Sequence, residues 1–137
     1  MKLEDFGIYN YKFNPDGTLD VFQNVNLGNM NLTKLPFKFG KVKGNFWCNG
    51  NRLTSLKGAP EEVNGDFNCN ANYIASLKSA PKIIKGDFRC NINYLKNIKY
   101  LNLDGISGKI YLIRNYNLIL SEKDKLWMIL NPGKIIR

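Results

Sequence analysis

Apolar side chains recur along the central part of the chain with a period of 21 residues. The clearest column holds Phe46, Phe67 and Phe88, and each of these residues follows a glycine by two positions. Agreement across several columns indicates a tandem repeat, in which each unit buries its apolar face against its neighbours. The other repeating columns are Cys48, Cys69 and Cys90; Leu53, Ile74 and Leu95; Leu56, Leu77 and Ile98; and Gly44, Gly65 and Gly86.

Each unit is expected to contain a short strand, because its apolar and polar residues alternate. In the second unit Phe67 and Cys69 would point inward, with Asn68 between them on the outer side. Parallel strands from successive units would form one sheet, with each phenylalanine over the phenylalanine of the next unit. An asparagine three residues beyond each strand is expected to turn inward and bond backbone groups that the tight turn leaves unpaired. These inward asparagines are Asn51, Asn72 and Asn93.

The column pattern, apolar-x-apolar-x-x-Asn-x-apolar-x-x-apolar, resembles that of leucine-rich repeats, with Phe and Cys at the two strand positions where Leu is usual. Leu-Thr-Ser-Leu at residues 53–56 and the later Pro60 resemble the short bacterial class. Residues 31–42, followed by Gly-x-Phe-x-Cys units, are similar to a family of uncharacterised repeat proteins common in bacteriophage genomes. The resemblance covers residues 24–118. It implies a β-rich solenoid, a right-handed coil with a parallel sheet on its concave face.

The N-terminal segment is expected to cap this repeat. Asn-Pro-Asp-Gly at residues 14–17 is a strong turn signal between two short apolar segments, so residues 1–22 are predicted to form a β-hairpin cap. The repeat itself is assigned to residues 23–120. Together with a second cap at the C-terminus, these parts are predicted to form a single domain over residues 1–137.

The C-terminal cap, residues 121–137, is expected to be helical. Ser121 and Asp124 have the spacing of a capping box, which would open a helix over roughly residues 121–130. Asn-Pro-Gly at residues 131–133 would end it. The side chains available to face the last unit are Leu126, Trp127, Ile129 and Leu130.

The composition argues against catalysis. The chain contains no histidine, which is the commonest general base and the commonest neutral metal ligand. The three cysteines fall in one predicted interior column, where burial would make the thiols unreactive. Asp66 and Asp87 recur one unit apart, but carboxylates in such places more often cap turns or bond nearby amides. No nucleotide-binding fingerprint is present, so we predict a protein without enzymatic activity, cofactor or metal.

Nothing in the sequence predicts export or membrane insertion. The N-terminal segment carries Glu4 and Asp5 and lacks the apolar core of a signal peptide. No stretch approaches the roughly 18 consecutive apolar residues that a membrane span needs. Three thiols in one column fit a reducing compartment. We therefore expect a cytoplasmic protein, and the host cytoplasm if the likeness to phage proteins holds.

The predicted concave face is the first candidate for a binding surface. Tryptophan, tyrosine and arginine are the residue types most enriched at binding hot spots, so Trp47, Arg89 and Tyr111 stand out. Two structural interpretations stay open, because Trp47 could instead pack on the N-terminal cap and the asparagine columns could form amide ladders. The candidate surface comprises Trp47, Asn49, Asn68, Asn70, Arg89, Asn91 and Tyr111.

A lysine-rich edge is the second candidate. The chain has a net charge of +9, which favours acidic partners. Lysines that recur at the 21-residue step would align along one edge and could follow a phosphate backbone. The alternative interpretation is a solvated surface, since arginines are scarce and aromatic residues are not interleaved with these lysines. The edge comprises Lys57, Lys78 and Lys99, with Lys82 and Lys85.

These features favour a protein-binding module over the other classes of function. The phage proteins have no assigned activity to transfer, but a small repeat without catalytic groups would suit stoichiometric inhibition of a host protein. An anti-phage defence component, such as a restriction or CRISPR effector, is one such target, and an acidic or nucleic-acid-binding protein would suit the charge. The alternatives are a nucleic-acid-binding protein that uses the lysine edge and a structural, virion-associated protein.

Overall fold

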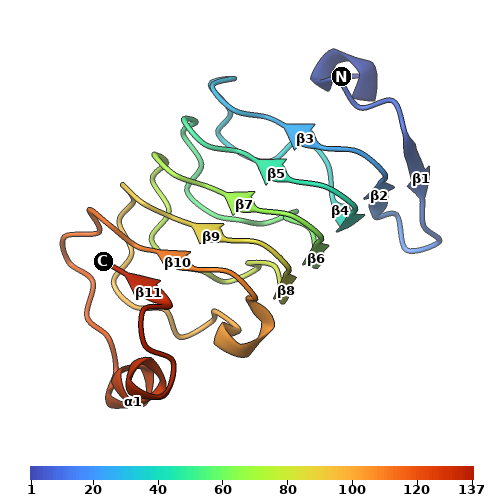
Figure 1. Ribbon diagram of the computed structural model, residues 1–137. Helices are drawn as coiled ribbons and strands as arrows, with labels where there is room; N and C mark the ends of the chain where they lie inside the picture. Colours follow the sequence, from blue (N-terminus) through green and yellow to red (C-terminus); the bar gives the residue numbers. More distant parts are fainter.

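The structure, a computed structural model, describes residues 1–137 and consists mainly of two sheets with one α-helix near the C-terminus (Figure 1). The six-stranded sheet has the order β11-β10-β9-β7-β5-β3, and the five-stranded sheet has the order β1-β2-β4-β6-β8. The first comprises β3 (Val25–Asn26), β5 (Phe46–Trp47), β7 (Phe67–Asn68), β9 (Phe88–Arg89), β10 (Ile110–Tyr111) and β11 (Ile135–Ile136). The second comprises β1 (Tyr11–Phe13), β2 (Leu19–Val21), β4 (Phe39–Val42), β6 (Glu62–Val63) and β8 (Ile83–Ile84).

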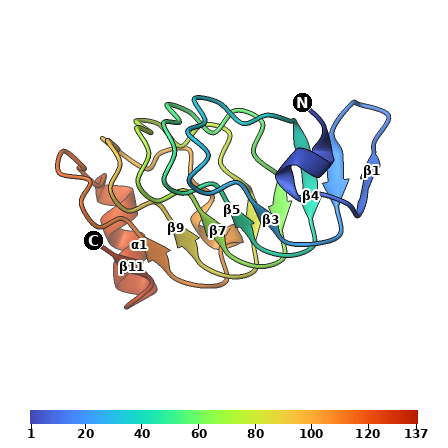
Figure 2. The same cartoon turned by 90° about the horizontal axis from the view of Figure 1, so that it is seen from above.

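The 21-residue period appears directly in the strand register. Phe67 pairs with Phe46 on one side and with Phe88 on the other, in parallel strands. From β2 to β9 the chain alternates between the two sheets, whereas β10 and β11 both belong to the six-stranded sheet (Figure 2). The predicted sheet-rich fold with parallel strands is therefore confirmed. The five-stranded sheet was not predicted, because β6 and β8 each hold a single buried residue, Val63 or Ile84, between a proline and a glycine.

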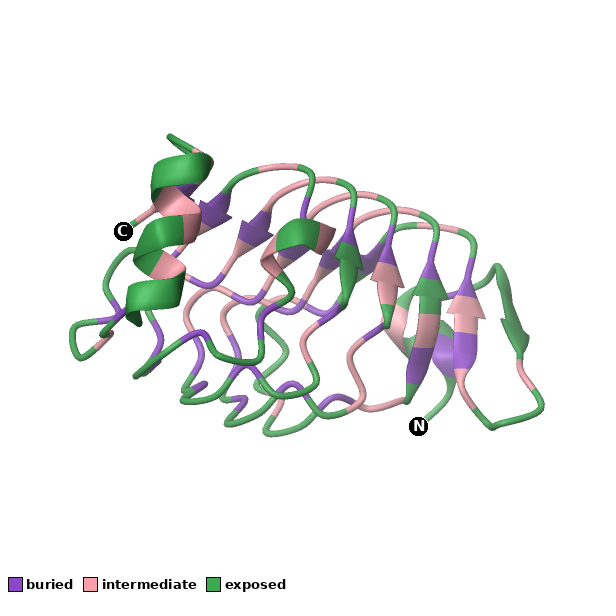
Figure 3. Cartoon of the chain, turned by 90° about the horizontal axis from the view of Figure 1, so that it is seen from below, coloured by how far each residue is buried: buried purple, intermediate pink, exposed green.

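Phenylalanine and cysteine fill the space behind the six-stranded sheet. The rings of Phe46 and Phe67 stack with centroids 5.5 Å apart, and those of Phe67 and Phe88 with centroids 5.8 Å apart. All three phenylalanines are completely buried, as are the three cysteines. One continuous core of 29 buried apolar residues runs from Leu3 to Ile135, as the burial colours of Figure 3 show along the strands. The inward direction predicted for both columns is confirmed.

The inward asparagines join neighbouring units. The Asn72 amide nitrogen donates to the carbonyl of Cys69 in its own unit at 3.1 Å and to that of Cys48 in the preceding unit at 3.0 Å. Its Oδ1 accepts the backbone N–H of Leu53 at 3.0 Å. The same role is taken at the other end of the series by Asn115, beyond a one-residue insertion. The predicted ladder is confirmed, and it satisfies backbone groups that the turn would otherwise bury unpaired.

The N-terminal hairpin is present and extends the five-stranded sheet. β1 and β2 are antiparallel, with Tyr11 opposite Val21, and β2 is parallel to β4. A short 3-10 helix, Leu3–Phe6, precedes the hairpin, and a second, Leu103–Gly105, follows β9. Val21 is completely buried, whereas β1 is exposed along its whole length. The hairpin thus covers the first unit with β2 and leaves β1 as a free edge.

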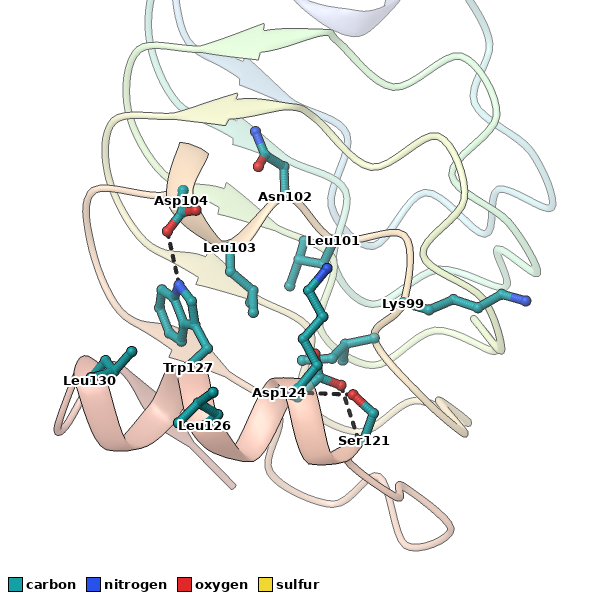
Figure 4. Close-up of a pocket in the computed structure, with 12 residues that line it drawn as sticks. Lys99, Leu101, Asn102, Leu103, Asp104, Ser121, Asp124, Leu126, Trp127 and Leu130 are labelled. Atoms are coloured by element: carbon teal, nitrogen blue, oxygen red, sulfur yellow. Dashed lines mark hydrogen bonds between the residues drawn. The ribbon is translucent and has the colours of Figure 1, made fainter.

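The C-terminal helix, α1 (Glu122–Leu130), begins and ends close to the predicted bounds. Its packing differs from the expectation, because Trp127 and Met128 contact the core while the other apolar side chains face outward. The indole of Trp127 donates to Asp104 Oδ1 at 2.8 Å, which fixes the helix beside the second 3-10 helix (Figure 4). β11 takes the last position of the sheet, beside β10. The helix therefore contacts the core only through the side that carries Trp127 and Met128. The exposed helix residues are Leu126, Ile129 and Leu130.

Ser121→Ala is expected to destabilise the C-terminal cap. The Ser121 Oγ accepts the backbone N–H of Asp124, and the Asp124 carboxylate accepts that of Ser121, both at 3.1 Å. Loss of such an N-cap costs about 1 kcal/mol. Urea unfolding should show this loss, with Ser107→Ala, an exposed serine outside any helix, as the control. Equal effects of the two substitutions would contradict a capping role.

Candidate binding surfaces

The outer face of the six-stranded sheet, which points away from the core, brings several predicted site residues into one row. Trp47 pairs with Asn68, Asn68 with Arg89, and Arg89 with Tyr111, on adjacent parallel strands. All four side chains are partly exposed, because each alternates with a buried phenylalanine, cysteine, isoleucine or leucine. The row crosses the middle of the sheet. The sequence prediction that these four residues share a face is consistent with this register.

Arg89 and Tyr111 are held in a defined geometry. The guanidinium of Arg89 lies over the Tyr111 ring, 4.3 Å from its centroid. The same guanidinium forms an ion pair with Asp87, with 3.3 Å between Nη2 and Oδ2. A cation held at once by a ring and a carboxylate loses less side-chain entropy when a partner binds. The pair is therefore suited to be a preorganised part of an interface.

Trp47 is the member of the row without a defined partner in the chain. Its indole N–H makes no hydrogen bond, and its ring takes part in no aromatic pair, whereas Trp127 has both a core contact and a hydrogen bond. The N-terminal hairpin belongs to the other sheet, so it does not pair beside Trp47. A partly exposed indole with a free donor is a chemically open position on this face.

The polar columns beside this row are largely occupied with backbone contacts. Asp66 Oδ1 accepts the N–H of Asp87 at 2.7 Å, and Asp87 Oδ1 accepts that of Lys109 at 2.8 Å. Asn70 and Asn91 likewise accept N–H groups from the following unit, both at 2.7 Å. These residues therefore act between units. Of the predicted asparagines, Asn68 Oδ1 accepts the N–H of Asn70, and the Asn49 side chain makes no hydrogen bond.

The predicted lysine edge is divided in the structure. Lys57, Lys78 and Lys99 are exposed and occupy equivalent turns, since each backbone N–H donates to a side-chain oxygen two residues earlier. Lys82 and Lys85 instead flank β8 of the five-stranded sheet. Carboxylates interrupt the basic character there. Glu61 and Glu62 precede Lys82 and Ile83 by one repeat, and Glu62 pairs with Lys41 at 3.8 Å.

The cysteine column has no metal or nucleophile geometry. No group of three or more histidine, cysteine, aspartate or glutamate side chains is arranged to hold a metal ion. Burial, with a smaller effect of the nearby Cys90, raises the pKa of the Cys48 thiol well above its ordinary value. Burial, a hydrogen bond with Cys90 and the nearby Cys90 and Cys48 raise the pKa of the Cys69 thiol as well. A thiol held neutral in this way is a poor nucleophile.

The two shifted thiols predict a loss of stability in alkali. Their pKa values are higher in the folded than in the unfolded chain, so the stabilisation is complete below the unfolded value of about 8.5 and is lost as pH rises above it. The free energy of unfolding should fall by up to about 1.4 kcal/mol per pH unit for each thiol. Urea titrations between about pH 8 and 10 should show this slope. A Cys48→Ala/Cys69→Ala variant with the same slope would contradict the assignment.

A hollow of about 460 Å³ lies between α1 and the segment around the second 3-10 helix (Figure 4). Leu101, Leu103 and Trp127 line it, and its two carboxylates are both engaged. Asp104 accepts from the Trp127 indole and Asp124 from the backbone of Ser121. Both carboxylates of the hollow are therefore already committed to hydrogen bonds within the protein.

Sequence reasoning missed a column of exposed aromatic residues on the turns after the six-stranded sheet. Tyr73 and Tyr94 stack with centroids 5.8 Å apart and an interplanar angle of 18°. Their exposed fractions are 47% and 60%, and Tyr116, at the corresponding place in the last unit, is 86% exposed. The signal was present in the sequence, because the first clear unit has Arg52 in this column, which identifies the position as one facing water.

No protein-family model, no curated protein and no solved structure matches the chain. The structure also contains no helix long and apolar enough to cross a membrane.

Proposed function

We propose that this protein is a leucine-rich-repeat solenoid that acts without catalysis, by stoichiometric binding to another protein. The strand register at the 21-residue step, the stacked phenylalanines and the inward asparagines support the repeat assignment. Repeats of this kind present an extended outer sheet face as a binding surface. The likeness to bacteriophage repeat proteins makes a host protein, such as an anti-phage defence component, the proposed class of target.

The observation that carries this proposal is the row formed by Trp47, Asn68, Arg89 and Tyr111. Three of the four are the residue types that dominate binding energy at interfaces. They lie in register on adjacent hydrogen-bonded strands, Arg89 is preorganised by Tyr111, and Trp47 has a free indole N–H. A preorganised surface of this kind binds a partner with little loss of conformational entropy.

The proposal is tested by affinity capture from bacterial lysate, including phage-infected cells, with immobilised wild-type protein and a Trp47→Ala variant. The matched control is Tyr9→Ala, which removes an aromatic side chain that is 71% exposed near the N-terminus. We expect a protein captured in a defined stoichiometry by the wild type and the control but not by Trp47→Ala. Equal capture by both variants, at unchanged thermal stability, would reject the outer face as the binding site.

Nucleic-acid binding is the second candidate function, favoured by the exposed Lys57, Lys78 and Lys99 column and the net charge of +9. The logarithm of the affinity for duplex DNA should fall linearly with the logarithm of the salt concentration. If the three lysines contact phosphates, replacing all three with alanine should make this slope shallower by about 2.7. A wild-type slope near zero, measured by fluorescence anisotropy against salt, would exclude this function.

A further inference from the structure

A second surface of the molecule lies on the turns that follow the six-stranded sheet. We call it the tyrosine edge and define it by Tyr73, Ile92, Tyr94, Arg114 and Tyr116. These residues line one shallow hollow of about 290 Å³, together with the buried Asn72 and Asn93 beneath it. The edge comes from three successive units, and its apolar residues are 47% to 86% exposed.

The backbone under this edge adopts the left-handed conformation at one equivalent position in each unit. The residue after each strand turn is left-handed in five successive units, at Asn29, Gly50, Ala71, Ile92 and Arg114, with φ between 55° and 66°. Glycine and asparagine adopt this conformation at low cost, and they occupy this position at Gly50 and Asn29. Isoleucine at φ 56° is a genuine outlier, because its branched side chain crowds the backbone. Ile92 is thus an exposed side chain at a position where glycine would relieve backbone strain.

The charges around the edge are all of one sign. No aspartate or glutamate occurs in residues 21–60, 67–86, 88–103 or 105–121, which include every turn of this edge. Arg114 belongs to the edge, Arg52 precedes Tyr73 in the same column, and Lys96 follows Tyr94 by two residues. The surface is therefore an aromatic and aliphatic centre within a rim of cations without counter-charges.

This chemistry distinguishes between possible occupants. A second copy would bring the same cations against this rim, so symmetric self-association is disfavoured. Single-stranded nucleic acid stacks its bases on successive aromatic rings, but Tyr73 and Tyr94 are stacked on each other, so no base can enter between them. A partner with apolar side chains surrounded by carboxylates would complement both the apolar centre of the edge and its positively charged rim.

We propose that the tyrosine edge is a docking site for an acidic protein segment, in which apolar or aromatic side chains contact Tyr94 and Ile92 and carboxylates contact Arg114 and Arg52. The inference rests on the protein-binding role proposed above but assigns a face distinct from the Trp47 row. Tyrosines with two side-chain torsions and preset stacking provide contact area at little entropic cost.

The test uses a displayed library of random linear peptides selected on the intact protein, followed by anisotropy titration of the enriched peptides. We expect the peptides to combine aspartate or glutamate with aromatic or large aliphatic residues. Tyr94→Ala and Ile92→Gly should weaken their binding by at least about tenfold. Because glycine occupies the same left-handed position at Gly50, Ile92→Gly should leave the melting temperature unchanged or raise it.

Each other outcome counts against the edge. Peptides that lose binding with Trp47→Ala but not with Tyr94→Ala would support the proposed function and overturn this inference. Enriched peptides without acidic residues, or no enrichment at all, would overturn the assigned partner chemistry. If an oligo(dT) probe bound more tightly than the enriched peptides, and this binding required Tyr94 and Tyr116, the edge would be assigned to nucleic acid instead. Tyr9→Ala serves as the aromatic control throughout.

Discussion

Asn72→Ala is expected to destabilise the protein by about 3 kcal/mol or more, because one side chain serves three buried backbone groups. Its amide donates to the carbonyls of Cys48 and Cys69, and its oxygen accepts the N–H of Leu53. Alanine removes all three bonds, and each unpaired buried group costs about 1–3 kcal/mol. Two of the three groups belong to the preceding unit, so the effect should extend across the boundary between units.

Urea unfolding followed by circular dichroism measures this loss. The matched control is Asn64→Ala, an exposed asparagine of the same region whose side chain makes no hydrogen bond and which should change stability by less than about 0.5 kcal/mol. If Asn72→Ala shifted the midpoint no further than this control, the ladder would contribute nothing to stability.

Phe67→Ala is expected to cost about 3–5 kcal/mol, the usual range for a fully buried aromatic residue. Its ring lies between those of Phe46 and Phe88 in nearly parallel planes, so deletion opens a cavity with a ring on each side. The parallel strands on both sides are hydrogen-bonded and hinder collapse of that cavity. Part of the loss therefore comes from the lost contacts and part from the space left behind.

The comparison for Phe67→Ala is Phe13→Ala on β1. Phe13 is 60% exposed and has Tyr11 as its only aromatic partner, so its removal should cost about 1 kcal/mol or less. Thermal unfolding of both variants measures the two losses of stability, which can then be compared. Similar costs for the two would mean that the stacked column is not the main source of core stability.

The repeat made much of the fold predictable from the sequence. A feature such as the Phe46, Phe67 and Phe88 column fixes the period, the direction of burial and the neighbour of each strand at once. In the last unit, beyond a one-residue insertion, Ile110 and Leu112 are buried like the strand residues of the other units, and Asn115 bonds the backbone as Asn72 does.

Elements without a periodic counterpart could not be predicted in the same way. Ile135 and Ile136 form β11 beside β10, but no second copy of this pair exists to indicate a strand. The orientation of α1 depends on the hydrogen bond from Trp127 to Asp104, which lies 23 residues earlier and has no sequence signature. Leu126, which by its apolarity was available to face the last unit, is 57% exposed.

The candidate surfaces show the same division. Alternation along each strand placed Trp47 and Tyr111 on one face, but it could not show that Arg89 lies over the Tyr111 ring. Nor could it show that Asn70 and Asn91 are committed to backbone N–H groups. The exposure of the tyrosine edge could have been inferred from Arg52 in the same column, but the stacking of Tyr73 on Tyr94 depends on the conformation of the turns, which the residue pattern does not specify.

The side-chain oxygen that each unit offers to the backbone of the next is matched by an equivalent acceptor one unit later, as at Asn45, Asp66 and Asp87. An in-frame duplication of residues 66–86 would therefore meet compatible surfaces at both new junctions. We expect such a gene rearrangement to yield a longer, foldable protein with one more strand in each sheet. The length of this molecule can therefore change by whole repeats during evolution, while the N-terminal and C-terminal caps stay the same.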